Sequence, residues 1–172
     1  MVNSFNLRPL GRDDIEELDS LLSFLPELYP NGDTWLATRE QQILEGNAYA
    51  VVAELNGEIV AALLGKDKGD KGFKISTLYV QESYRGQGIG KALLRAALRD
   101  NLLIIRERGA YITVPVNENY HSLDSLLVTQ GFSLSLSLSL SIKKTDTVLV
   151  AMSWSTVPNI QNRVINRSSV HK

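Results

Sequence analysis

Apolar residues recur along this chain with two periods, and each period predicts one kind of element. Alternation of apolar and polar residues, as over residues 5–10, indicates a strand with one buried face. Leucines that recur every three or four residues, as over residues 15–25, indicate a helix with one buried stripe. The predicted strands are Phe5–Leu10, Ala48–Leu55, Glu58–Leu64, Phe73–Val80, Ala110–Val116, Phe132–Ile142 and Thr147–Trp154. The predicted helices are 13–25, 34–45, 89–108 and 120–130.

Turn residues set several of these boundaries. Asn56-Gly57 between two apolar runs predicts a tight hairpin, because both residues tolerate positive φ. The third helix is expected to end at Asn101 or to run on to Arg108, with Gly109 as its C-cap. The element order β-α-α-β-β-β-α-β-α-β-β predicts an α/β protein with one mixed central sheet of about seven strands and about four helices.

Residues 132–142 carry the most regular pattern, with leucines at alternate positions and serines between them. This period of two predicts a half-buried antiparallel strand rather than a disordered low-complexity segment. Eleven residues exceed the usual strand length of ~5–6, so we expect a bend or a bulge. Because every Leu-Ser step is alike, the leucines specify the register of this strand only weakly.

The composition narrows the class of protein. At 172 residues, 44% hydrophobic and 22% charged, the chain suits one globular domain. A net charge of −1 argues against a nucleic acid or an anionic membrane as partner. The chain has no cysteine and two distant histidines, so no metal site is expected. Without a signal peptide or an apolar run of ~20 residues, we expect a cytoplasmic protein.

A glycine-rich segment, Arg85-Gly86-Gln87-Gly88-Ile89-Gly90, joins the strand Phe73–Val80 to the helix that follows it. Glycines let successive backbone N–H groups converge without a Cβ in the way. At a helix N-terminus, these donors and the helix dipole favour an anion. The segment therefore predicts a phosphate cradle, to which Arg85 and Lys91 add positive charge.

Other interpretations of this loop fit less well. The spacing Gly86-x-Gly88-x-Gly90 matches a Rossmann dinucleotide loop only loosely, because that motif separates its last two glycines by three positions and belongs to a leading βαβ unit. A Walker A loop would require a following Gly-Lys-Ser/Thr. A tight turn that uses its glycines for geometry alone is the remaining alternative.

The segment resembles the Arg/Gln-x-x-Gly-x-Gly/Ala signature of the Gcn5-related N-acetyltransferases, the GNAT family. The preceding Leu78-Tyr79-Val80, the following Lys91-Ala92-Leu93-Leu94 and the later Gly131-Phe132 fit the same family. With the element order, the resemblance covers roughly residues 4–154.

The resemblance implies a GNAT-type acyl-CoA N-acyltransferase fold. Its sheet would splay between the strands Phe73–Val80 and Ala110–Val116, where the thioester of acetyl-CoA enters. We place the acetyltransferase domain at residues 1–155. Residues 156–172 are polar and lack periodicity, and we expect a flexible tail there.

For the cofactor, the resemblance implies acetyl-CoA and no metal. Backbone amides from Gln87 to Gly90 would hold the coenzyme A diphosphate, and Leu78–Val80 would pair with the pantetheine arm as a strand would. Asn117 and Asn119 lie where asparagines touch the cofactor in some members, and a turn role is equally open. The implied cofactor-binding residues are Leu78, Tyr79, Val80, Arg85, Gly86, Gln87, Gly88, Ile89, Gly90, Lys91 and Asn119.

The attacking amine must lose a proton, so the reaction needs a base. The family often places an acidic residue on the strand before the loop, but Phe73–Val80 holds none. It also often places a tyrosine as general acid where Leu126 and Leu127 stand here. His121 is the candidate base, because the ordinary pKa of a histidine, ~6.5, suits the task, and Tyr120 is the candidate acid. A histidine bonded to backbone at a helix start, and a packing tyrosine, are the alternatives.

The resemblance implies an N-acetyltransferase that moves an acetyl group from acetyl-CoA to an amine of a small molecule or a protein, by direct attack in a ternary complex. The missing acid and tyrosine leave open a non-catalytic acyl-CoA-binding regulatory module of the same fold. A homodimer is also open, and the near-neutral charge argues against an aminoacyl-tRNA acceptor. The residues that can line the acceptor wall, or are plain helix surface, are Tyr29, Asp33, Trp35, Arg39 and Glu40.

Overall fold

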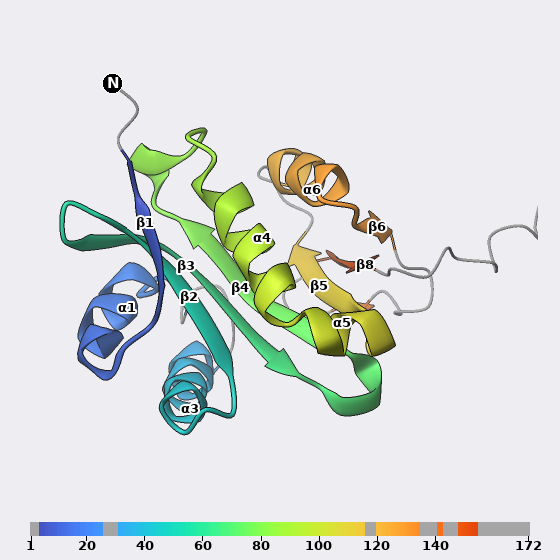
Figure 1. Ribbon diagram of the computed structural model, residues 1–172, viewed down its shortest axis with the longest axis horizontal. Coiled ribbons are helices and arrows are strands. Elements are labelled where there is room, and N and C mark those ends of the chain that lie inside the picture. The colour runs from blue at the N-terminus through green and yellow to red at the C-terminus, as the bar shows by residue number, and fades with distance from the viewer. Residues whose placement is uncertain (1–3, 26–30, 116–119, 135–140, 143–147, 155–172) are drawn as a thin grey trace, which may run out of the picture.

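The protein is represented by a computed structural model, which describes residues 4–25, 31–115, 120–134, 141–142 and 148–154. Its strands form one mixed sheet in the order β1-β2-β3-β4-β5-β8-β6, with β7 paired to β8 (Figure 1). The strands are β1 (Asn6–Pro9), β2 (Tyr49–Leu55), β3 (Glu58–Asp67), β4 (Phe73–Val80), β5 (Ala110–Pro115), β6 (Ser133–Leu134), β7 (Ser141–Ile142) and β8 (Val148–Trp154). The helices are α1 (Ile15–Leu21), α3 (Gly32–Leu44), α4 (Ile89–Asp100), α5 (Leu102–Arg108) and α6 (Tyr120–Thr129), with short 3-10 turns η1 (Arg12–Asp14), η2 (Gly69–Lys71) and η3 (Glu82–Tyr84). The predicted tail lies outside the described residues.

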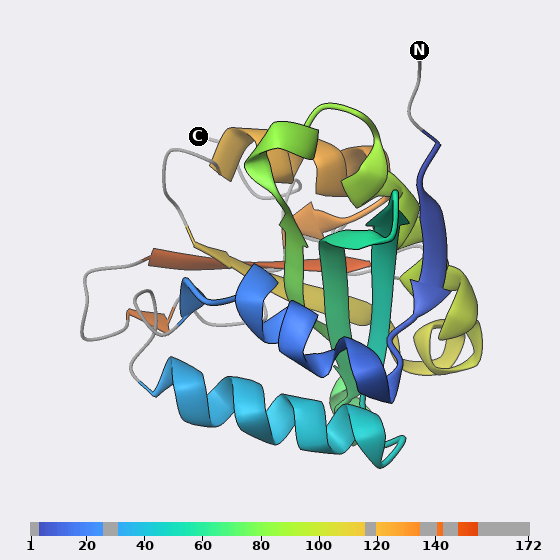
Figure 2. The ribbon, with the colours of Figure 1, turned by 90° about the vertical axis from the view of Figure 1, so that its left-hand side faces the viewer.

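Helices cover both faces of the sheet. α1 and α3 lie on one face, across β2 and β3, and α4, α5 and α6 lie on the other (Figure 2). The residues of β2 alternate between two cores: Val51 and Ala53 face α4, whereas Ala50 and Val52 face α1 and α3. Leu127 of α6 joins the first of these cores. Because both faces are covered, the middle of β3, residues 59–64, is apolar and buried at every position.

The predicted order of elements is confirmed over the described residues, and the turn residues explain two boundaries. Asn56 and Gly57 join β2 to β3 with φ angles of 53° and 86°, as expected for a tight hairpin. The third predicted helix is two helices, α4 and α5, which meet at Asn101. The side-chain Nδ2 of Asn101 donates to the Ala97 carbonyl at 2.9 Å. This local bond competes with the backbone bonds of a continuous helix.

The predicted strand Phe132–Ile142 differs most from the structure. Two short strands, β6 and β7, appear within it, and the residues between them lie outside the described part of the chain; with both counted, the described residues form eight strands, close to the predicted number of about seven. Both pair with β8, but Leu134 lies opposite Met152, whereas Ser141 lies opposite Leu149. From Leu134 to Ser141 is seven positions, and from Leu149 to Met152 is only three. Identical Leu-Ser steps cannot specify such an offset.

One carboxyl group is buried where α3 packs near α1. Glu40 is 9% exposed, and its Oε1 has no hydrogen-bond partner among the described residues. Burial, together with the neighbouring Asp19 carboxyl of α1, raises the pKa of Glu40 to about 7. Glu40 is therefore part of the contact between these helices rather than plain helix surface.

We expect Glu40→Gln to stabilise the protein above neutral pH. The pKa of Glu40 rises from 4.5 to about 7 on folding, so the free energy of unfolding falls as the pH rises from about 4.5 to about 7, and it does not recover above that. The amide keeps the shape of the side chain and cannot ionise. Urea denaturation should show a gain of about 1–2 kcal/mol near pH 8.5 and about none near pH 4.5.

The exposed Glu16 of α1 offers a control for this prediction. Glu16→Gln removes the same charge without relieving burial, so it should change the free energy of unfolding little at either pH. An equal gain for Glu40→Gln at both pH values would contradict the explanation by burial. At the lower pH Glu40 is protonated and uncharged, so burying it should cost no more than burying glutamine.

Candidate functional site

The sheet opens between β4 and β5. These parallel strands pair only from Phe73, opposite Ala110, to Ile75, opposite Ile112. Beyond this point β4 continues along β3 as far as Val80, while β5 continues along β8. The predicted splay is confirmed, and it leaves one edge of β4 without a neighbour among the described strands.

A β-bulge marks the point where the strands part. Adjacent residues of β3, Leu64 and Gly65, lie opposite Thr77 and Ile75, so Ser76 is the extra residue of β4. A bulge bends its strand and increases the local twist, which favours the divergence from β5. The hydroxyl oxygen of Ser76 is buried here without a hydrogen-bond partner among the described residues. The sequence shows no sign of this bulge, because Ser76 lies within an uninterrupted strand pattern.

The free edge of β4 presents backbone groups to the gap. The Gln81 N–H donates to the Val60 carbonyl of β3 at 2.9 Å. Because backbone groups alternate sides along a strand, Tyr79 also faces β3, whereas Leu78 and Val80 face the gap. An extended ligand along this edge can bond to these groups as a neighbouring strand would.

Arg85 contacts the same edge. Its Nε donates to the Val80 carbonyl at 3.0 Å, and its guanidinium lies 5.8 Å from the centre of the Tyr79 ring. The Tyr79 ring packs against Phe24, with 4.6 Å between ring centroids. Arg85 therefore brings its charge to the end of β4, and the Tyr79 side chain belongs to the face of the sheet that α1 covers.

The loop after β4 leaves backbone donors unpaired at the start of α4. Gly86 and Gly88 have left-handed φ angles of 76° and 82°, which glycine adopts without strain. The first bond within the helix runs from the Ala92 N–H to the Gly88 carbonyl at 3.0 Å. The N–H groups of residues 88–91 therefore have no acceptor within α4. Three of these four amides, those of residues 88–90, are among the ones that the family resemblance implies for the diphosphate.

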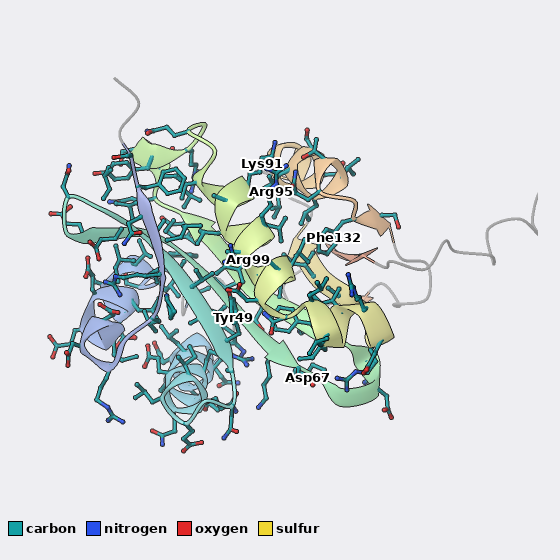
Figure 3. The ribbon with its side chains drawn as sticks, in the orientation of Figure 1. Tyr49, Asp67, Lys91, Arg95, Arg99 and Phe132 are labelled. Atoms are coloured by element: carbon teal, nitrogen blue, oxygen red, sulfur yellow. The ribbon has the colours of Figure 1, made fainter. Side chains whose placement is uncertain are left out.

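The surroundings of these amides suit an anion. A Cβ built on Gly86 or Gly88 would meet no atom within 4 Å, so the space beside the loop is open. The first turn of α4 holds no acidic residue, and Lys91, Arg95 and Arg99 follow one another along the helix (Figure 3). The loop thus combines unpaired amides, the positive end of a helix dipole and a nearby ammonium group.

The candidate acid and base stand at the start of α6. The helix begins at Tyr120, which His121 follows, but both side chains lie outside the described residues, as do Asn117 and Asn119 altogether. Leu127, at a position where the family often has a tyrosine, is fully buried in the core. The backbone therefore places Tyr120 and His121 after β5, which borders the gap, and their roles stay predictions.

Two polar residues of α3 are buried, whereas their polar character alone was also consistent with plain helix surface. Arg39 is 6% exposed and Glu40 is 9% exposed. The sequence pattern did indicate this burial, because the two residues follow the apolar Leu36 by three and four positions and precede Ile43. This spacing places both residues on the inner stripe of the helix.

The described residues support neither a metal site nor a membrane-spanning helix. Within them, no three His, Cys, Asp or Glu side chains come together in a way that could hold a metal ion. Nor does any helix in this part of the chain combine the length and apolar character that a bilayer crossing requires. Anion binding at the loop before α4 is the chemistry that the described residues support best.

A comparison with protein families agrees with this geometry. The model of the Acetyltransferase (GNAT) family matches residues 15–126. No curated protein sequence matches the chain significantly.

Solved structures are similar at low sequence identity. An acetyltransferase of the GNAT family from Staphylococcus aureus Mu50 is 20% identical, with a TM-score of 0.68 over 88% of this chain and 98% of its own. A GNAT family acetyltransferase from Elizabethkingia anophelis with acetyl-CoA bound is 14% identical, with a TM-score of 0.63 over 87% and 97%. The ribosomal-protein-S18-alanine N-acetyltransferase from Escherichia coli is 14% identical, with a TM-score of 0.65 over 91% and 98%. At these identities the similarity shows the fold alone.

Proposed function

This chain belongs to the Acetyltransferase (GNAT) family, and from this premise we propose that it is an N-acetyltransferase that uses acetyl-CoA. The acetyl group passes to an amine of a small molecule or a protein by direct attack while both substrates are bound. The observation that carries the proposal is the turn before α4, where the N–H groups of residues 88–91 lack acceptors within the helix beside open space at Gly88. A diphosphate satisfies these donors and the helix dipole together.

The described residues fit coenzyme A in two parts. The amides of residues 88–91 and the ammonium group of Lys91 would hold the diphosphate. The backbone groups of Leu78 and Val80 would pair with the pantetheine arm, for which Arg85 must release or share the Val80 carbonyl. The thioester then lies in the gap, where an N–H of the β4 edge would stabilise the oxyanion of the reaction.

We assign the proton transfers to the start of α6. His121 takes a proton from the ammonium form of the acceptor and passes it to water, and the neutral nitrogen then bonds to the carbonyl carbon of the thioester. As the amide forms, His121 takes the second proton from this nitrogen. The carbon–sulfur bond breaks, and Tyr120 gives a proton to the sulfur, which yields an amide and a free thiol. His121 returns its proton to Tyr120 through water. The support for this assignment is that α6 follows β5, the strand that borders the gap.

We expect His121→Gln to lower kcat by roughly a hundredfold or more, since a general base contributes about that factor. Free-thiol release at saturating acetyl-CoA measures the rate, and the variant should also lose the rise of kcat through the ordinary pKa range of histidine. The thermal shift with coenzyme A should not change. Ser122→Ala is the control and should retain kcat. An unchanged rate in His121→Gln would place the base elsewhere.

A regulatory module that binds acyl-CoA without turnover is the second candidate. It is favoured by the sequence of β4, Phe73–Val80, which holds no acidic residue. Free-thiol release in panels of amines and peptides discriminates the two functions. Release of thiol with any amine supports the transferase, whereas coenzyme A binding without release across the panels supports the module.

A further inference from the structure

The free edge of β4 ends in a carbonyl group that already has a side-chain partner. The Val80 backbone faces the gap between β4 and β5, because the neighbouring Gln81 N–H bonds to β3. The Nε of Arg85 donates to the Val80 carbonyl at 3.0 Å. Arg85 therefore occupies an acceptor that an extended ligand along this edge would use.

The charge of Arg85 is not paired with an acid in the described part of the chain. Its side chain is exposed, and no described Asp or Glu forms a salt bridge with it. The guanidinium lies 5.8 Å from the centre of the Tyr79 ring. A guanidinium has five N–H donors, and the bond to Val80 uses one of them. Arg85 can therefore leave this carbonyl for an anion without breaking an ion pair with any described residue.

The amides at the start of α4 lie next to the same end of β4 (Figure 1). A Cβ built on Gly90 would lie 3.6 Å from Cγ2 of Val80. Gly90 is one of residues 88–91, whose N–H groups have no acceptor within α4. Because Arg85 contacts Val80 and Gly90 adjoins Val80, a diphosphate bound to these amides comes within reach of the Arg85 guanidinium.

We propose that Arg85 selects the acyl donor, because it blocks the pantetheine site on β4 until a diphosphate binds the guanidinium instead. The inference rests on the proposed function and concerns the molecule that delivers the acetyl group. A guanidinium bonds a phosphate through paired, charge-assisted hydrogen bonds, which are stronger than one bond to a neutral carbonyl. Coenzyme A carries both the diphosphate and the pantetheine arm, so its binding frees the Val80 carbonyl. A thioester on a pantetheine arm without the diphosphate must compete with Arg85 for this carbonyl.

The two parts of coenzyme A should therefore favour each other's binding even when they are separate molecules. Pyrophosphate at the start of α4 takes Arg85 from Val80 and opens the edge to a pantetheine arm. Because such coupling is reciprocal, pantetheine should also favour the binding of pyrophosphate. The coupling passes through one side chain, so the loss of that side chain should remove it.

Two acetyl donors, acetyl-CoA and S-acetylpantetheine, test the selection in a free-thiol assay with an amine that the protein acetylates. Arg85→Ala should raise kcat/KM for S-acetylpantetheine roughly threefold or more, because a competing hydrogen bond is gone. The same variant should lower kcat/KM for acetyl-CoA roughly tenfold, because a phosphate contact is lost. A merely structural role of Arg85 would lower both values. An unchanged or lower kcat/KM for S-acetylpantetheine overturns the proposal.

Pyrophosphate supplied as a separate molecule tests the unchanged protein. At constant ionic strength, and at a concentration that saturates its thermal shift, pyrophosphate should raise kcat/KM for S-acetylpantetheine roughly threefold or more. It should have no such effect on Arg85→Ala, which should fold because Arg85 is exposed. Arg106→Ala, at an exposed site of α5, is the matched control and should behave as the unchanged protein does with both donors. No activation of the unchanged protein by pyrophosphate overturns the proposal.

A binding measurement decides the case in which no amine is turned over. In calorimetric titrations with pantetheine, saturating pyrophosphate should raise the affinity of the unchanged protein roughly threefold or more and leave that of Arg85→Ala the same. Equal affinities of the unchanged protein with and without pyrophosphate overturn the selection by Arg85. A missing thermal shift with coenzyme A contradicts the proposed function instead.

Discussion

Gly88→Glu is expected to abolish the binding of coenzyme A. The substitution puts a carboxylate beside the amides of residues 88–91, in space that is open at Gly88 and that the diphosphate would fill. The carboxylate repels the diphosphate and competes for the same N–H donors. A φ of 82° is also unfavourable for a residue with a Cβ, so the loop itself should shift. We expect the affinity to fall by roughly a hundredfold or more, a loss of about 2.7 kcal/mol.

Titration calorimetry and thermal unfolding with coenzyme A check this prediction. At a ligand concentration of a hundred times Kd, the unchanged protein should gain about 2.7 kcal/mol of stability. Gly57→Glu is the matched control, because Gly57 has a φ of 86° and equally open surroundings but lies in the turn between β2 and β3. Gly57→Glu should lower the free energy of unfolding by about as much as Gly88→Glu does, and it should keep the thermal shift with coenzyme A. A full shift in Gly88→Glu would refute the placement of the diphosphate.

Gly72→Ala should lower the free energy of unfolding by about 3 kcal/mol or more, the largest effect on stability that we expect from one added methyl group. The new Cβ would lie 2.4 Å from the Gly109 carbonyl oxygen and 2.5 Å from that of Arg108. Both atoms are backbone and cannot rotate away. The Gly109 carbonyl also accepts the Phe73 N–H at 3.0 Å, so a shift disturbs the start of β4. A φ of 82° at Gly72 adds backbone strain.

Gly69→Ala distinguishes the steric contact of the added Cβ from the strain of a positive φ. Gly69 lies in the same β3–β4 connection as Gly72, with a φ of 61°, but has open space at its Cβ position. It should cost only about 1 kcal/mol. Urea denaturation of both variants measures the difference, provided that the denaturant dependence of unfolding stays the same. An equal loss of unfolding free energy in both variants would mean that the backbone near Gly109 can move to accommodate the new Cβ. The close approach of α5 and β4 would then not be rigid.

Features that depend on consecutive residues were predictable. Asn56-Gly57 required a hairpin, and the structure shows positive φ at both residues. The strand Phe73–Val80 has the predicted bounds, and α4 begins at Ile89, directly after the glycines of the loop. In each case the steric preferences of neighbouring residues decide the conformation, whatever the rest of the chain does.

Features that depend on distant segments were not predictable. The bulge at Ser76 exists because β3 pairs with β4 on both sides of one extra residue. The offset between β6 and β7 depends on which residues of β8 they face, which identical Leu-Ser steps leave undecided. The burial of Arg39 and Glu40 was indicated by their spacing from Leu36, but whether a described acid pairs with Arg39 depends on what packs against α3.

The sequence by itself determined the strand, the glycine turn and the helix start that leave the amides of residues 88–91 without acceptors within α4, because backbone sterics and helix ends are properties of adjoining residues. Only the tertiary structure decided where the gap beside β4 opens and that Arg39 is buried with no salt bridge to any described residue. Both depend on which residues, far apart along the chain, come to lie opposite one another when the layers pack.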